Sequence, residues 1–182
     1  MQDILNQDQK NRLLAIARTT IKEYVKTQSV LDFQEDDSVL NENMGAFVTL
    51  HKKGVLRGCI GNIVGQKPLY ITIRDMAIES AFSDPRFSPV SSDEISDVDI
   101  EISVLSKLKK IDNSNEIIIG THGVLVKQGF KSGVYLPQVG IETGWSRDEF
   151  MNSLCGQKVG IATESWRDGS CEIYIFTATV FS

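Results

Sequence analysis

The chain has 182 residues, of which 41% are hydrophobic and 24% charged, and its formal net charge is -5. These values are ordinary for a globular protein and exclude a chain that is disordered throughout. A chain of this length buries roughly 70% of its unfolded surface, so we expect a single domain over residues 1–182, which could consist of two lobes. The acidic balance argues against a nucleic-acid partner, and the densest basic run, Lys107 to Lys110, is interpreted as a solvated loop.

The cysteines and the apolar runs bear on the compartment. Residues 1–11 lack a basic stretch followed by an apolar one, and no apolar run approaches the roughly 18 residues of a membrane helix. The three cysteines, Cys59, Cys155 and Cys171, lack the paired spacing of a disulfide framework or a zinc site. We therefore expect free thiols, no metal, no other cofactor, no membrane partner and a cytoplasmic location.

The first half of the chain predicts a helix, a hairpin, a second helix and a strand. Apolar residues at offsets of three and four predict an N-terminal helix of about twenty residues, and they are Leu13, Ile16, Ala17, Ile21, Tyr24 and Val25. Strand-like runs at 46–51 and 55–60 are joined through Gly54, which suits a tight turn. Pro68 fits the first turn of a second helix, and the alternation over 98–104 predicts a strand with one buried face.

The second half repeats this order. Runs at 124–128 and 134–136 flank a glycine-bounded loop at 129–133 and predict another hairpin. Ser146 and Glu149 form a capping-box signature for a helix, and 172–181 is rich in strand-forming residues. We therefore predict an α+β fold of two β-β-α-β units plus an N-terminal helix, with mainly antiparallel sheets and flanking helices.

A series of short motifs extends over nearly the whole chain. They are GAFVTL at 45–50, LRGCIG at 56–61, DPRF at 84–87, IEISVLS at 100–106, HG at 122–123, LPQV at 136–139, Trp145 and KVGI at 158–161. In this order they resemble the AMMECR domain family. The resemblance implies an α+β fold with antiparallel sheets and an internal duplication, and no established reaction. Relatives are fused to, or encoded beside, Memo-type and radical-SAM proteins, which implies an accessory role in a small enzyme system.

Cys59, in the RGCIG motif, is the sharpest candidate for chemistry. Arg57 stands two residues before it and is expected on the same strand face, about 7 Å away, where a guanidinium favours a thiolate. Gly58 and Gly61 are expected to leave bare backbone beside the sulfur for a ligand. The alternative is a small buried cysteine whose neighbouring glycines serve a β-bulge.

Other polar residues are candidates at lower rank. His122 lies in a turn and is predicted to act as general base to Cys59 if the fold brings the two within about 3 Å, the alternative being a turn histidine bound to backbone. His51 is expected to be solvated at a hairpin edge. Glu101 could line a groove, whereas Ser103 on the same strand face is expected to meet water.

The turn at 84–86 has two interpretations. Asp84 and Arg86 bracket a proline, and they form either a local ion pair that ends the helix or a site at which Arg86 binds an anion. The spacing of Gly61 and Gly65 does not fit a phosphate-binding loop, so nucleotide hydrolysis is not predicted.

Two functions fit these residues. The first is a thiolate-using enzyme or enzyme accessory that acts on a small polar metabolite, with Cys59 and His122 as catalytic residues. The second is a non-catalytic protein- or ligand-binding module that presents the hairpin segment 57–61. The ligand-binding candidates are Arg57, Gly58, Gly61, Arg86 and Glu101. A third, structural interpretation makes the motif a folding nucleus. The partner is an unknown small molecule or protein.

Overall fold

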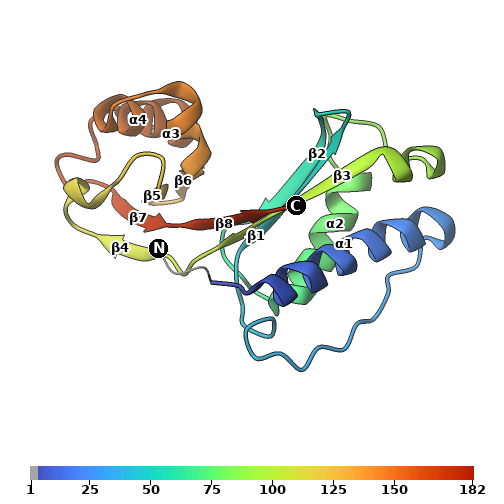
Figure 1. The fold of residues 1–182 in the computed structure, drawn as a ribbon. Helices are drawn as coiled ribbons and strands as arrows, with labels where there is room; N and C mark the ends of the chain where they lie inside the picture. Colours follow the sequence, from blue (N-terminus) through green and yellow to red (C-terminus); the bar gives the residue numbers. More distant parts are fainter. Residues whose placement is uncertain (1–3) are drawn as a thin grey trace. The chain divides into compact units, whose positions relative to one another are not determined.

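The computed structural model describes residues 4–182 and shows an α+β chain that divides into two compact units (Figure 1). The first unit runs to Leu105 and also takes in Thr179–Ser182, whereas the second is Ser106–Ala178. Each unit has its own hydrophobic core and one antiparallel sheet of four strands. Within residues 4–182, no helix combines the length and the apolar character needed to cross a lipid bilayer.

The first unit confirms the predicted helix and the β-β-α-β order after it. Its elements are α1 (Gln7–Thr27), β1 (Ala46–Lys52), β2 (Val55–Asn62), α2 (Leu69–Phe82) and β3 (Val98–Leu105). Asn6 caps α1, because its side chain accepts the Gln9 N–H while the Gln9 side chain accepts the Asn6 N–H. Lys53 and Gly54 make the hairpin turn with φ of 53° and 76°, the left-handed geometry that two-residue hairpins need.

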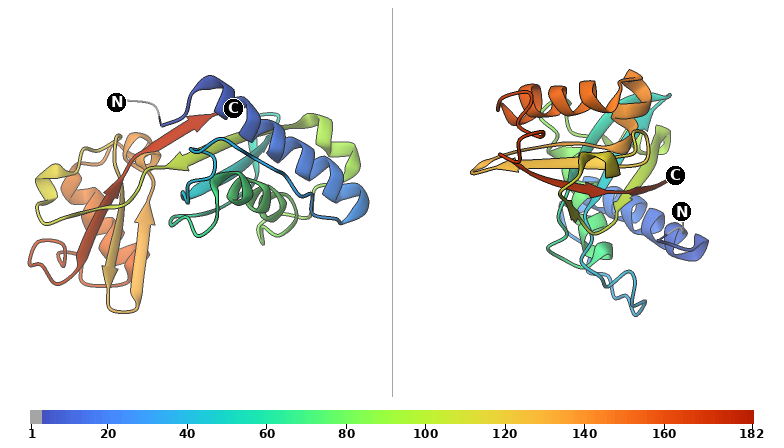
Figure 2. Two further views of the ribbon diagram at one scale, coloured as in Figure 1. Left: turned by 90° about the horizontal axis from the view of Figure 1, so that it is seen from below. Right: turned by 90° about the vertical axis from the view of Figure 1, so that its left-hand side faces the viewer.

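The strands of the first sheet lie in the order β2-β1-β3-β8, where β8 is Ala178–Phe181 (Figure 2). Ala46, Val48 and Leu50 of β1 point into the core with the apolar faces of α1 and α2. The opposite face of the sheet, which carries the alternate residues of each strand, is called the outer face below.

Ser103 corrects one expectation about the outer face. It was expected to meet water, but it is 4% exposed. Strand β3 lies between β1 and β8, and Ser103 is directly opposite Phe47 of β1. Side chains of the neighbouring strands therefore shield Ser103 from water.

The second unit departs further from the prediction. Its elements are β4 (Lys109–Ile111), β5 (Gly123–Gln128), β6 (Lys131–Tyr135), α3 (Pro137–Thr143), α4 (Arg147–Ser153) and β7 (Glu172–Phe176), and the strand order is β4-β7-β5-β6. The α4 capping box is confirmed, and the helix continues as π-helical turns over Leu154–Val159. The second hairpin loop is shorter than predicted, because residues 131–133 belong to β6.

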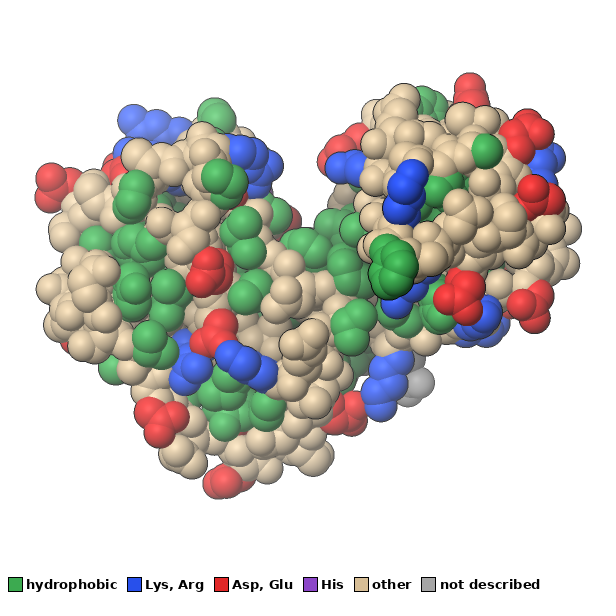
Figure 3. Space-filling view, turned by 180° about the vertical axis from the view of Figure 1, so that it is seen from behind, with side chains coloured by type: hydrophobic (Ala, Val, Ile, Leu, Met, Phe, Trp, Pro, Cys, Tyr) green, Lys and Arg blue, Asp and Glu red, His purple; other side chains and the backbone are tan. Residues whose placement is uncertain are grey.

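The predicted strand 172–181 and the basic loop are both corrected. The run 172–181 forms two strands, β7 in the second sheet and β8 in the first. The pairing partners change between Phe176 and Ala178, and no turn residue marks this change in the sequence. Lys109 and Lys110 lie in β4, where they pair with Glu116 and Glu172. Figure 3 shows one face of the molecule, on which acidic and basic side chains are interspersed.

Candidate functional site around Cys59

Cys59 belongs to a row of side chains that crosses three strands on the outer face. Thr49 of β1 is paired with Cys59 of β2 on one side and with Glu101 of β3 on the other. The Thr49 hydroxyl donates a hydrogen bond to Cys59 Sγ at 3.3 Å. Cys59 is partly exposed.

A second row lies beside the first on the same face. His51 follows Thr49 by two residues on β1 and is paired with Asp99 of β3. Residues directly opposite on antiparallel strands have Cβ atoms about 5 Å apart, and diagonal neighbours about 7–8 Å apart. His51 is therefore a close neighbour of both Cys59 and Asp99. Among residues 4–182, no side-chain hydrogen bond or ion pair engages His51, Asp99 or Glu101.

Sequence reasoning missed His51, which it placed in solvent at the hairpin edge. The residue is half-buried on β1, which lies between two other strands. The alternation of the apolar residues Val48 and Leu50 with Thr49 and His51 was the available signal in the sequence, since it assigns Thr49 and His51 to one face.

A β-bulge determines which side chains share the face of Cys59. The hairpin register runs Lys52 to Val55 and His51 to Leu56, and then shifts so that Leu50 pairs with Gly58. The shift leaves Arg57 as the extra residue, without a partner on β1. Residues two positions apart share a face only in a regular strand, so Arg57 and Cys59 are no longer expected on the same face. The bulge named as an alternative in the sequence is present, but Cys59 is not fully buried beside it.

Arg57 is fixed away from the sulfur by its own partners. Its guanidinium binds the Glu94 carboxylate, with Nε at 3.2 Å from Oε1 and Nη2 at 3.0 Å from Oε2. It also donates to the carbonyls of Ser88 and Pro89. Arg57 and Lys52 hold the pKa of Glu94 well below its usual range. The expectation that Arg57 tunes the thiol is therefore corrected, because its charge is neutralised by Glu94.

Asp84 and Arg86 hold the backbone of Cys59 from the outer edge of β2. Asp84 Oδ2 accepts the Cys59 N–H at 2.9 Å, and Arg86 Nη2 donates to the Cys59 carbonyl at 3.2 Å. The two side chains also pair with each other at 2.7 Å, which confirms the predicted local ion pair. The Asp84 side chain is 2% exposed and the Arg86 side chain 53% exposed. Arg86 thus keeps an accessible cationic surface next to Cys59.

The electrostatics of this turn favour ionised side chains. The hydrogen bond from Arg86 lowers the pKa of Asp84 well below its usual range, burial opposes this, and the Cys59 N–H adds to the lowering. The same pair raises the pKa of Arg86. Both charges therefore persist over the whole physiological range.

Gly58 and Gly61 have packing roles that the sequence analysis did not assign. A Cβ on Gly58 would collide with the backbone carbonyl of Ser80, and one on Gly61 would collide with the Phe47 ring. The space expected for a ligand at these positions is therefore filled by the chain itself. Ser80 also joins the strands, since its hydroxyl accepts the Ile60 N–H at 2.9 Å and donates to a β1 carbonyl at 2.7 Å.

His122 belongs to the second unit, whereas Cys59 belongs to the first. Its Nδ1 accepts the Ile118 N–H at 3.2 Å, the backbone-bound arrangement named above as its alternative. Cys155 and Cys171 also belong to this unit. Burial raises the pKa of Cys155 to about 12 and also raises that of Cys171, whose thiol donates to the Ser165 carbonyl at 3.4 Å. In the part of the chain that is described, no cluster of three or more His, Cys, Asp or Glu side chains could hold a metal ion.

Comparisons with known proteins agree with the fold. The AMMECR1 family model matches residues 14–181. A protein of Methanothermobacter thermautotrophicus is 37% identical over 184 residues, which cover 97% of this chain and 95% of the relative. Protein MK0488 of Methanopyrus kandleri is 39% identical over 178 residues, or 93% of this chain and 86% of that protein. The crystal structure of uncharacterized protein PH0010 from Pyrococcus horikoshii superposes with a TM-score of 0.84 at 35% identity, covering 97% and 92% of the two chains. None of these names states a reaction.

Proposed function

The chain belongs to the AMMECR1 family, and from the geometry around Cys59 we propose that it is a thiol-dependent enzyme, or the thiol-bearing accessory of one, that acts on a small polar metabolite. The observation that carries the proposal is the row across the outer face, in which Thr49 donates to Cys59 Sγ beside the unpaired side chains of His51 and Glu101. The proposed setting is the reducing cytoplasm, in a Memo- and radical-SAM-associated system.

The residues of this face have distinct proposed roles. Cys59 is the nucleophile, and Thr49 stabilises its thiolate through the hydrogen bond to Sγ. His51 takes the thiol proton, and Asp99, which is paired with it on the adjacent strand, is the carboxylate that would orient the imidazole on substrate binding. His51 thus fills the role that the sequence assigned to His122.

Two charged groups suit a small polar substrate. The exposed side of Arg86 would bind an anionic group such as a carboxylate, because guanidinium pairs with carboxylate in two parallel hydrogen bonds. Glu101 would accept a hydrogen bond from an amine or a hydroxyl of the same molecule. A substrate that spans these two groups passes over Thr49 and Cys59 on the way.

The experiment is alkylation of the folded protein by iodoacetamide from pH 5 to 10, with each cysteine quantified by mass spectrometry. We expect Cys59 to react near pH 7 while Cys155 stays unmodified, because burial raises the pKa of Cys155 to about 12. His51→Asn should slow the reaction of Cys59 at pH 7 by about tenfold or more.

His122→Asn is the matched control, since it removes the other histidine of the chain. It should leave alkylation of Cys59 unchanged. Slowing by His122→Asn alone would return the role of base to His122. Reaction of Cys59 only after unfolding would overturn the thiol proposal.

A second candidate function is a non-catalytic binding module that presents the 57–61 hairpin. The observation in its favour is the hairpin tip, where Val55 is 69% and Leu56 37% exposed. Cys59→Ser separates the two functions in a strain whose growth depends on this protein. Loss of growth supports the enzyme, whereas retained growth combined with loss in a Val55→Ser, Leu56→Ser variant supports the binding module.

A further inference from the structure

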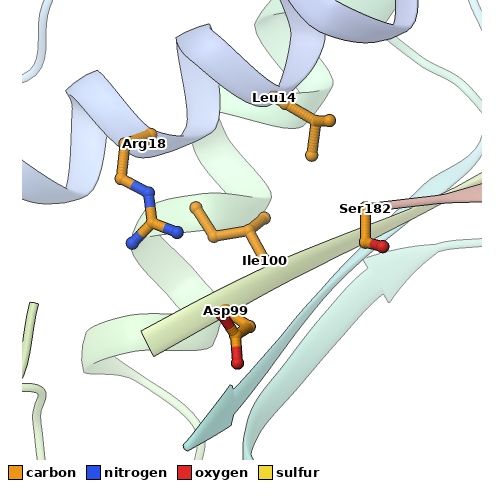
Figure 4. A pocket seen from close by; sticks show the side chains of 5 residues that line it. All are labelled: Leu14, Arg18, Asp99, Ile100 and Ser182. Atoms are coloured by element: carbon orange, nitrogen blue, oxygen red, sulfur yellow. The ribbon is translucent and has the colours of Figure 1, made fainter. Parts of the chain in front are cut away.

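A pocket of about 320 Å³ opens in the first unit between α1 and β3 (Figure 4). Leu14 and Arg18 of α1 form one wall, and Asp99 and Ile100 of β3 form the other, with Ser182 at the end. In Figure 4 the Arg18 and Ile100 side chains approach each other across the pocket, while the Asp99 side chain points away from the helix. The pocket size lies at the lower end of the range for ligand sites, about 300–1,000 Å³.

Among residues 4–182, no strand pairs with part of the β3 edge at this pocket. It has eight residues, whereas its outer neighbour β8 has four, so β8 covers about half of the β3 edge. The uncovered half is the one that contains Asp99 and Ile100, because Ser182, the residue after β8, lines the pocket together with them. An uncovered strand edge presents N–H and C=O groups that can pair with a further strand.

Arg18 gives the pocket a cation with open donors. Its Nη1 donates to the Ile95 carbonyl at 3.1 Å, which holds the guanidinium beside the strand. Within residues 4–182, Nε and Nη2 have no partner. Leu14 and Ile100 supply apolar surface on both sides. Hydrogen-bonding groups along a strand edge, an apolar wall and a fixed guanidinium are the parts of a site for an extended peptide.

We propose that this pocket binds an extended, acidic peptide segment of a partner protein, which adds to β3 in line with β8 and places a carboxylate on Arg18. The segment pairs with the β3 backbone at Ile100, whose N–H and C=O face away from β1, and packs one apolar side chain between Leu14 and Ile100. The site uses the backbone of β3 and not the Asp99 side chain, which points away from the helix, and it would serve to recruit a partner.

The test uses a fluorescein-labelled probe peptide, Thr-Val-Thr-Val-Glu with an amidated C-terminus, in a fluorescence-anisotropy titration of the whole chain. We expect binding with a Kd in the micromolar range, weakened about tenfold or more by Arg18→Gln. Lys22→Gln removes the same charge from an exposed position on the same helix and should change the Kd less than twofold.

A Glu→Gln change in the peptide keeps the test valid if Arg18→Gln perturbs folding. It should weaken binding to the same degree, with no further loss when both changes are combined. Hydrogen exchange at Ile100, whose N–H faces away from β1 in the strand register, should slow when the peptide is bound. No binding up to millimolar peptide, or equal Kd values for Arg18→Gln and the unaltered chain, would overturn the proposal. Self-association that Arg18→Gln abolishes, seen by analytical ultracentrifugation, would also overturn it, because a second copy would then occupy the edge.

Discussion

At the scale of single residues, the Asp84 carboxylate accepts a backbone hydrogen bond that a neighbouring strand would accept elsewhere in the sheet. β2 is an edge strand, so the outward N–H of Cys59 has no strand partner. The buried Asp84 carboxylate accepts this N–H and is itself paired with Arg86. The position of Cys59 on the edge therefore depends on one carboxylate whose ionised form is stabilised.

Asp84→Asn should lower the free energy of unfolding by about 1–3 kcal/mol at pH 7, because a charged acceptor of several hydrogen bonds is lost. The folded-state pKa of Asp84 is lowered, so its contribution is complete above about pH 4 and is lost as pH falls through the folded value. The difference between the variant and the unaltered chain should therefore shrink below about pH 4 in urea unfolding followed by circular dichroism.

The control for Asp84 is Asp36→Asn, since Asp36 is exposed. It should shift the unfolding midpoint very little at any pH. A difference for Asp84→Asn that stays constant between pH 3 and pH 7 would contradict the assigned role.

The residue types of the site were visible in the sequence, but their arrangement was not. The RGCIG motif pointed to Cys59, and the proline turn pointed to the pair of Asp84 and Arg86. The partners of Arg57 could not be predicted, because Glu94 lies 37 residues away and no periodic pattern links the two. Long-range partners of this kind are set by the tertiary fold.

At the scale of elements, the bulge in β2 decides which face carries Cys59. A regular hairpin continued from the turn would pair Cys59 with Val48, whose side chain is buried in the core. The extra residue at Arg57 shifts the register by one and pairs Cys59 with Thr49 instead. The alternation of apolar and polar residues predicts strands and their faces. A β-bulge adds one residue without a distinctive residue type, so the alternation in the sequence does not reveal it.

Gly58→Ala should destabilise the first unit by about 3 kcal/mol, because the new methyl group meets the Ser80 carbonyl on the tightly packed α2. Gly54→Ala is the matched control, since its Cβ meets nothing within 4 Å and carries only the strain of φ 76°, about 1 kcal/mol. Urea unfolding of both variants gives the comparison. Equal losses of unfolding free energy in the two variants would show that α2 can move away from β2 to accommodate the methyl group.

At the scale of the whole molecule, the chain leaves the first unit at Leu105 and returns to it at Thr179. The predicted β-β-α-β order holds for the first unit. For the second unit the prediction lacked β4 and α3, because elements of three and seven residues are too short for a clear periodic signal. The division of 172–181 between two sheets was also beyond the sequence, because strand propensity does not indicate which sheet a strand joins.

Deletion of residues 178–182 should speed hydrogen exchange in the half of β3 that β8 covers, because β8 is the outer neighbour of β3 there. Exchange in β5, which belongs to the other sheet, should change little. Val180→Ser is the control, since it keeps the strand backbone and alters a side chain that is 43% exposed. Unchanged exchange in β3 after the deletion would show that β8 does not stabilise the first sheet.

The return of the chain to its first sheet has a consequence for biosynthesis. A ribosome releases residues in order, so α1 through β3 emerge well before β8, which is separated from β3 by the whole second unit. Until then the full length of β3 is an uncovered edge, the kind of surface at which nascent chains associate wrongly. The first unit can therefore complete its sheet only after the second unit has been synthesised, and a chain stalled after Leu105 would be a natural substrate for chaperones.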